Sequence, residues 1–253
     1  MPVRYARRLT GRKRTALANR HLGVALAFVA GAINAGGFLA VQQYTSHMTG
    51  IVSAMADHIA LGAYKLVLSG LGGVLSFLLG AACCTLMISY SRRHRLHGEY
   101  ALPLLLEAVL LLCFGFLGAT LATVEGFFVP LTVTLLCFIM GLQNALITKL
   151  SHAEIRTTHV TGIITDIGIE LGKLCYWNRH KGSNRPPVLA DRARLRMLSL
   201  LALSFFLGGL AGAIGFQRLG YSSTLPLALL LVLLAGVPAL DDLRSLLRRR
   251  QRG

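Results

Sequence analysis

The sequence predicts an all-α, polytopic membrane protein. Hydrophobic residues fill 54% of its 253 positions and charged residues only 14%, whereas soluble domains carry about a quarter charged residues. The apolar residues form long uncharged runs, and most basic residues lie between these runs. This pattern excludes an ordinary soluble enzyme, a disordered tail and a disulfide-rich secreted module. It also argues against a nucleic-acid partner, which would require basic residues gathered on one folded face.

Six apolar segments are long enough to cross a bilayer, which takes about 20 residues for about 30 Å of hydrocarbon. Pro103, Pro130 and Pro226 fall in the first turns of their segments, where a missing N–H costs little. We therefore expect about six transmembrane helices. They cover residues 22–44, 68–90, 101–123, 127–149, 197–217 and 224–240.

The basic residues indicate how these helices are oriented. In a six-span topology, 24 of the 26 Lys and Arg residues fall on one side, and only Lys65 and Arg218 fall on the other. Under the positive-inside rule the basic side is the cytoplasm. We therefore expect a multi-pass protein with both termini cytoplasmic, and we attribute the net charge of +16 chiefly to orientation.

The two halves of the chain resemble each other in sequence. Each half holds three predicted spans, an odd number, so the second half must enter the membrane from the opposite face. The sequence thus predicts an inverted 3+3 repeat, an arrangement that recurs in secondary transporters. The matched segments are GAINA (31–35) with GLQNA (141–145), TSHMTGI (45–51) with TTHVTGI (157–163), SFLLG (76–80) with SFFLG (204–208), and LPL (102–104) with LPL (225–227).

This repeat defines the predicted organisation of the chain. Residues 1–20 form a basic cytoplasmic N-terminus and residues 21–123 the first three-span repeat. Residues 124–240 form the second, inverted repeat, and residues 241–253 a basic cytoplasmic tail. Gly72, Ser76, Gly80 and Cys84 recur every four residues, as do Ser204, Gly208 and Gly212. Such small-residue stripes are typical of close helix packing in lipid.

A hydroxyl-rich motif in each half precedes a stretch that suits a helix but is too polar for a simple span. These stretches are residues 50–68 and 162–177. We expect two re-entrant or interfacial half-helices, whose N-terminal N–H groups would favour an anionic or zwitterionic solute. The alternative is that each motif caps an ordinary surface helix.

Polar residues at matched positions are the candidates for solute binding. A buried amide such as Asn34 or Asn144 needs hydrogen-bond partners, and each has a glycine three residues before it. An interhelical hydrogen bond is the alternative explanation. The candidate substrate-binding residues are Asn34, Asn144, His47, Thr49, Gly50, His159, Thr161, Gly162 and Asp166.

The acidic residues near the second motif allow two interpretations. His159, Asp166, Glu170 and Lys173 would share one face of a helix. They could relay protons, because histidine titrates near neutrality, or they could form the wet face of an amphipathic helix with a Glu–Lys pair. Glu107 lies inside a predicted span, where it either serves function or extends toward the interface.

The sequence contains no pattern that predicts a metal or cofactor site. Its five cysteines include no C-x-x-C pair, and no H-x-x-x-H or E-x-x-H spacing occurs. We therefore expect no metal, no cofactor and no catalytic residues. The rival hypothesis of a metal-dependent intramembrane enzyme would use His47, His159, Asp57 or Asp166.

The repeated motifs resemble the YoaK family of uncharacterised bacterial inner-membrane proteins, a domain of unknown function. The likeness lies in GAINAGGF with SHMTG, and in GLQNA with RTTHVTG and TDIG (165–168), and it extends over nearly the whole chain. The resemblance implies about six spans in the bacterial cytoplasmic (inner) membrane, and it implies no substrate.

We expect a small secondary transporter or channel for a small solute, and no enzyme. Its expected partners are the lipid bilayer and a small-molecule solute, with no nucleic acid. Homo-oligomer formation stays open. A membrane scaffold or interaction protein that transports nothing is the alternative.

Overall fold

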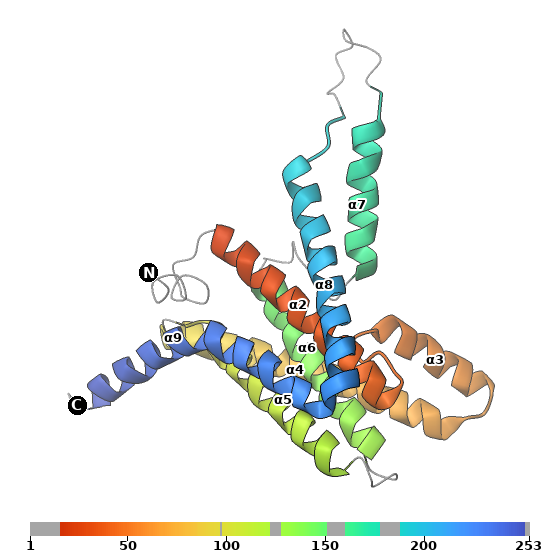
Figure 1. Ribbon diagram of the computed structural model, residues 1–253, viewed down its shortest axis with the longest axis horizontal. Coiled ribbons are helices and arrows are strands. Elements are labelled where there is room, and N and C mark those ends of the chain that lie inside the picture. Colours follow the sequence, from red (N-terminus) through yellow and green to blue (C-terminus); the bar gives the residue numbers. More distant parts are fainter. Residues whose placement is uncertain (1–15, 97, 122–127, 151–159, 178–187, 251–253) are drawn as a thin grey trace.

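The computed structural model describes residues 16–96, 98–121, 128–150, 160–177 and 188–250. Every regular element in these ranges is a helix, as predicted. The helices form a bundle from which two helical hairpins project (Figure 1). The elements are α2 (Ala16–Val41), α3 (Met48–Ala60), α4 (Tyr64–Arg93), α5 (Ala101–Leu121), α6 (Phe128–Leu150), α7 (Val160–Cys175), α8 (Arg192–Leu219), the short 3-10 helix η1 (Gly220–Ser223) and α9 (Thr224–Arg250).

Five helical segments among the described residues are long and apolar enough to cross a membrane. Four belong to α2, α4, α5 and α6, and the fifth runs over 45 residues, from Arg192 to Gly236. This fifth segment contains α8, η1 and the start of α9, so it covers both of the last two predicted spans. A bilayer crossing takes about 20 residues, and the chain turns sharply between α8 and α9 (Figure 1).

Helices α2 and α8 pack together through small residues. Gly208 lies directly against the Phe28 carbonyl, and Gly31 lies against the Phe205 carbonyl, where a Cβ atom would have no room. The Ser204 hydroxyl donates a 2.8 Å hydrogen bond to the Val24 carbonyl. The contacts advance in the same direction along both helices, so α2 and α8 run parallel.

Helices α4 and α6 pack in the same way. Gly80 lies against the Phe138 carbonyl and Gly141 against the Phe77 carbonyl. The Ser76 hydroxyl donates a 2.6 Å hydrogen bond to the carbonyl of Thr134. Helices α4 and α6 are therefore also parallel. The residues of α4 that make these contacts, Ser76 and Gly80, align in the sequence repeat with Ser204 and Gly208, which join α8 to α2. The close packing predicted for both small-residue stripes is therefore confirmed, although Gly73 and not Gly72 is the buried glycine at the start of the α4 stripe.

The helix pairs α2–α6 and α5–α9 are antiparallel. Helices α2 and α6 cross where Gln143 donates a 3.4 Å hydrogen bond to the Leu26 carbonyl, and where Gly37 approaches Leu136. Helices α5 and α9 pair near the turn at η1, where Gly115 meets Thr224. Side chains from these long helices form the main hydrophobic core.

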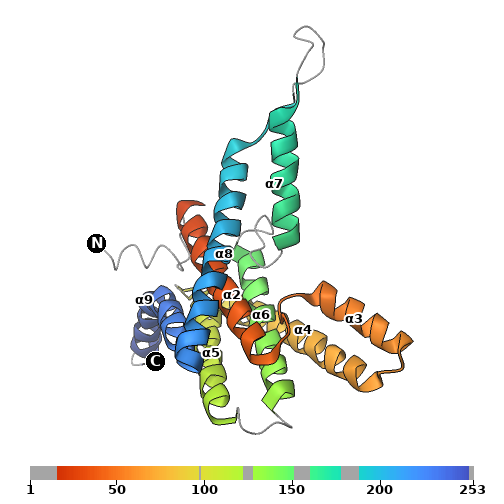
Figure 2. The ribbon, with the colours of Figure 1, turned by 45° about the vertical axis from the view of Figure 1, so that its right-hand side comes forward.

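The short helices α3 and α7 each pack along the first part of the next helix. Helix α3 lies beside the start of α4, and α7 lies beside the start of α8 (Figures 1 and 2). In the first hairpin Gly70 faces Met55, and in the second Ile163 packs with Leu198. Both hairpins extend away from the core, and large apolar side chains on all four helices are exposed.

The predicted half-helix at 50–68 is wrong in its bounds. Helix α3 ends at Ala60, and α4 already begins at Tyr64. Gly62 has a positive φ of 69° in the turn between them, a conformation that glycine adopts without steric cost. The prediction for 162–177 agrees closely with α7. Helix α9 continues to Arg250, beyond the predicted span end at residue 240.

Candidate functional site

The structure connects Asn34 to the hydroxyl-rich motif of the first half. The Ser46 hydroxyl donates a 2.7 Å hydrogen bond to the side-chain oxygen of Asn34. This bond ties the middle of α2 to the link that leads into α3. Asn34 thus has a hydrogen-bond partner, as the alternative explanation requires, but the partner lies in the link before α3 and not on another helix.

A partly open cavity of about 350 Å³ lies where α2 ends and where α3 meets the start of α4. We call this cavity the α2–α4 pocket. Phe38, Ile51, Met55 and Leu66 supply apolar walls. Its size lies in the range of about 300–1,000 Å³ that is typical of small-molecule sites. The polar residues that line it are Gln42, Gln43, Tyr44, His47, His58 and Ser69.

Two of the predicted site residues line the α2–α4 pocket, namely His47 and Gly50. A Cβ atom at Gly50 would press against the ring of His47, so glycine lets that ring lie over the first turn of α3. His47 is the N-cap residue but makes no side-chain capping bond. The N-terminal N–H groups of α3 are therefore not capped by their own N-cap side chain, which suits a site for a negative group.

Gln42, the residue directly after α2, has an unusual conformation. Its φ of 55° is rare for a residue other than glycine. A strained backbone conformation persists only where the surrounding structure holds it in place, and such conformations cluster at functional sites. The turn at Gln42 directs the chain around the pocket, where Phe38 and Tyr44 stack with ring centroids 4.5 Å apart.

The second-half candidates do not line this pocket. Asn144 donates a 2.8 Å bond to the Met140 carbonyl of its own helix. Thr161 and Gly162 lie in the first turn of α7, and Thr161 is exposed. His159 lies outside the described residues. In the first half, Thr49 is likewise exposed on α3, outside the pocket lining.

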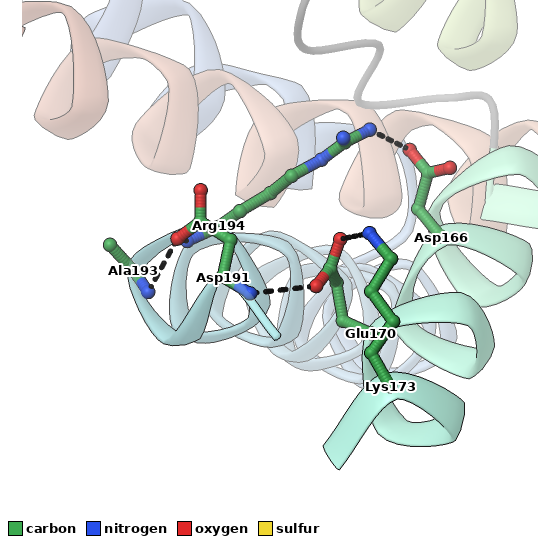
Figure 3. A network of polar contacts seen from close by, with 6 residues as sticks. All are labelled: Asp166, Glu170, Lys173, Asp191, Ala193 and Arg194. Carbon is green, nitrogen blue, oxygen red and sulfur yellow. Dashed lines mark hydrogen bonds and ion pairs between the residues drawn. The ribbon is translucent and has the colours of Figure 1, made fainter. Parts of the chain in front are cut away.

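The acidic face of α7 is tied to the start of α8 (Figure 3). Glu170 accepts a 2.9 Å bond from the Lys173 ammonium and a 2.8 Å bond from the backbone N–H of Asp191. Asp166 pairs with Arg194 at 3.0 Å. Asp191 in turn caps α8 by accepting from the N–H groups of Ala193 and Arg194. The Glu–Lys pair of the second interpretation is therefore present, but Glu170 is buried against the start of α8 and does not lie on a wet face.

The Lys173 ammonium and the N–H of Asp191 lower the pKa of Glu170 below its ordinary value. A lowered pKa means that the folded state favours the charged carboxylate. The resulting stabilisation is present at neutral pH, and it is lost as the pH falls through the lowered folded-state pKa, below about 4.3.

We expect Glu170→Gln to loosen the α7–α8 hairpin at neutral pH, as acid does in the parent protein. The variant removes the charge that binds Lys173, so amide hydrogen exchange in α7 should become several times faster while α2 and α6 stay protected. Asp57→Asn, which changes an exposed carboxylate on the corresponding helix α3, is the matched control. Equal exchange in Glu170→Gln and the parent would show that the network does not hold α7.

Sequence reasoning missed most of the α2–α4 pocket. Gln42, Gln43 and Tyr44 are the last three residues of the first predicted span, and this short polar run was a usable signal that the helix ends before them. His58 and Ser69 gave none, because they come from two different helices. Within the described ranges, no cluster of three or more His, Cys, Asp or Glu residues could hold a metal ion.

Several long apolar helices that pack closely at glycine residues are the features of a multi-pass helical membrane protein. Residues 22–237 match the family described as "Protein of unknown function (DUF1275)", and the chain belongs to this family. It is 27% identical over 166 residues to the "UPF0700 transmembrane protein YoaK" of Bacillus subtilis (strain 168), covering 65% of this chain and 72% of that relative. No solved structure matches the chain.

Proposed function

We propose that the protein is a small secondary transporter or channel for a small solute, built as an inverted 3+3 repeat of six membrane helices. It would lie in the bacterial cytoplasmic membrane with both termini in the cytoplasm. The matched packing of α2 with α8 and of α4 with α6 carries this proposal.

Helix direction is the first support. If each long helix crosses once, α2, α5 and α8 run outward, while α4, α6 and α9 run inward. The contacts agree with this order: α2 is parallel to α8, and α4 is parallel to α6. Helix α2 is antiparallel to α6, and α5 is antiparallel to α9. When each half has an odd number of spans, the second half lies in the membrane with the opposite orientation to the first, which gives these helix directions.

Equivalent burial is the second support. Residues 31–37 and 141–147 follow the same order of buried and half-buried positions, with Asn34 and Asn144 both half-buried. The bond from Ser204 to Val24 corresponds to the bond from Ser76 to Thr134. Two halves with equivalent contacts can exchange conformations, so that a site opens first to one side and then to the other.

The α2–α4 pocket supplies a place for the solute. Its walls combine apolar side chains with amide, imidazole and hydroxyl groups, as small-molecule sites commonly do. The N-terminus of α3, marked by His47 and Gly50, lies at this pocket. The positive end of a helix dipole favours an anionic or zwitterionic solute.

Reconstitution of the full-length protein tests the proposal. The purified protein is first screened by thermal shift against small carboxylates, amino acids, inorganic anions and divalent metals. Radiolabelled versions of any stabilising solute are then offered to protein-containing and empty liposomes. We expect at least one solute to raise the Tm and to enter only the protein-containing liposomes.

Variants connect that activity to the site. Asn34→Ala breaks the bond to Ser46, so it should lower uptake by about tenfold, the effect of about 1.4 kcal/mol. Thr165→Ala is the control, because its hydroxyl bonds only to a carbonyl of its own exposed turn. If no solute in the panel stabilises or enters, and the protein instead binds a metal or a second membrane protein, the transport proposal is wrong.

A further inference from the structure

Glu107 is buried in the middle of the helix bundle. It lies on α5, and its exposed fraction is 0%. Neither of its carboxyl oxygens has a hydrogen-bond partner among the residues that the structure describes. The side chain therefore does not extend to the interface, which the sequence had left open.

Among the residues that the structure describes, no basic side chain forms an ion pair with Glu107. Helices α4, α6 and α9 and the short helix η1 pack against α5. From α4 the nearby ionisable group is the buried thiol of Cys84, and the closest basic residue on α6 is Lys149, exposed at the helix end. Helix α9 carries no titratable residue from Thr224 to Leu240. The titratable residue of η1, Tyr221, packs at the opposite end of α5, beside Gly118.

The cost of burying charge decides the protonation state. An ionised carboxylate without a partner in an apolar interior costs far more than the neutral acid, so the group takes up a proton. Proton uptake forms one O–H bond on a carboxyl oxygen and changes no other bond. The packed arrangement seen here therefore requires a neutral Glu107.

We propose that Glu107 is a proton-binding site, neutral in this conformation and able to ionise only when α5 separates from α4 and α6. Its use to couple solute movement to a proton gradient rests on the proposed function. The protonation itself depends only on the packing around α5.

The two halves differ at this position. The LPL segments at 102–104 and 225–227 align Glu107 with Leu230 of α9. Helices α5 and α9 are equivalent in the proposed repeat, and they pack against each other. Of these two helices, only α5 carries a carboxyl group at this position. A second unpartnered group, the buried hydroxyl of Ser91, lies two turns beyond Cys84 on the same face of α4.

Infrared spectroscopy of the full-length protein in liposomes tests the site without any solute. At neutral pH the parent should show the carbonyl band of a protonated carboxylic acid, and carboxyl-labelled ¹³C-glutamate should shift it. Glu107→Gln, which keeps the side-chain shape, should lose the band. Glu99→Gln is the control, because Glu99 is paired with Arg92 at 3.3 Å and should give no such band.

The outcomes separate this proposal from the proposed function. If the band is absent at neutral pH, or persists in Glu107→Gln, the proton-binding site is wrong whether or not a solute is transported. If Glu107→Gln does not fold, titration of the labelled parent decides. Alkaline pH favours the conformation in which α5 has separated and Glu107 has ionised, so the band must disappear as the pH rises. Absence of solute flux, by contrast, overturns the proposed function and leaves the infrared result unchanged.

Discussion

Gly80→Ala is expected to destabilise the protein strongly, whereas Gly72→Ala on the same helix is not. A methyl group at Gly80 would occupy the position of the Phe138 carbonyl, so α4 and α6 must move apart. Overpacking of this kind costs roughly 1–3 kcal/mol or more. Since each kcal/mol shifts the Tm of a chain this size by about 2–4 °C, we expect an apparent Tm roughly 2–12 °C lower in detergent.

The matched control distinguishes packing from helix propensity. A Cβ atom at Gly72 meets nothing within 4 Å, so alanine there should leave the Tm unchanged or raise it slightly through its better helix propensity. Gly208→Ala should reproduce the loss seen for Gly80→Ala, because Gly208 meets the Phe28 carbonyl in the equivalent contact. If both Gly80→Ala and Gly208→Ala keep the Tm of the parent protein, the glycine contacts do not hold the bundle together.

Ala54→Trp is expected to lower solute uptake at least about tenfold while leaving the fold intact. Ala54 lines the α2–α4 pocket from α3, and an indole ring would fill much of its approximately 350 Å³. Because the ring enters existing space, the Tm should change little. Uptake of any solute identified by reconstitution should fall at least about tenfold, equivalent to about 1.4 kcal/mol of lost binding.

Ser53→Trp is the control for that experiment. Ser53 precedes Ala54 on α3 but is exposed and does not line the pocket. The same large side chain there should permit normal uptake. Equal uptake by the parent and both tryptophan variants would place the solute site elsewhere in the bundle.

The sequence was sufficient to locate the long helices, for physical reasons. A bilayer requires long apolar runs, and proline at an early helical position marks where such a run starts. Thus α5 and α6 begin within a residue or two of their predicted starts. The boundary near Gln42 was missed, because its positive φ comes from the surrounding chain and not from residue preference.

The partners of each helix could not be predicted from sequence. The small-residue stripes on α4 and α8 indicated close packing, but they did not indicate which helix packs against each stripe. The structure places α6 against one and α2 against the other. The pocket was missed for a similar reason, since its lining comes from α2, α3 and α4 together.

The pairing of α2 with α8 has a consequence for biosynthesis. The ribosome completes α2 about 150 residues before it begins α8, and it completes α4 well before α6 is fully made. The face of α2 that packs against α8 must therefore remain without this partner during most of translation. Final assembly is consequently a late, post-insertion event, and a chain that stops after α6 leaves α2 without its principal neighbour.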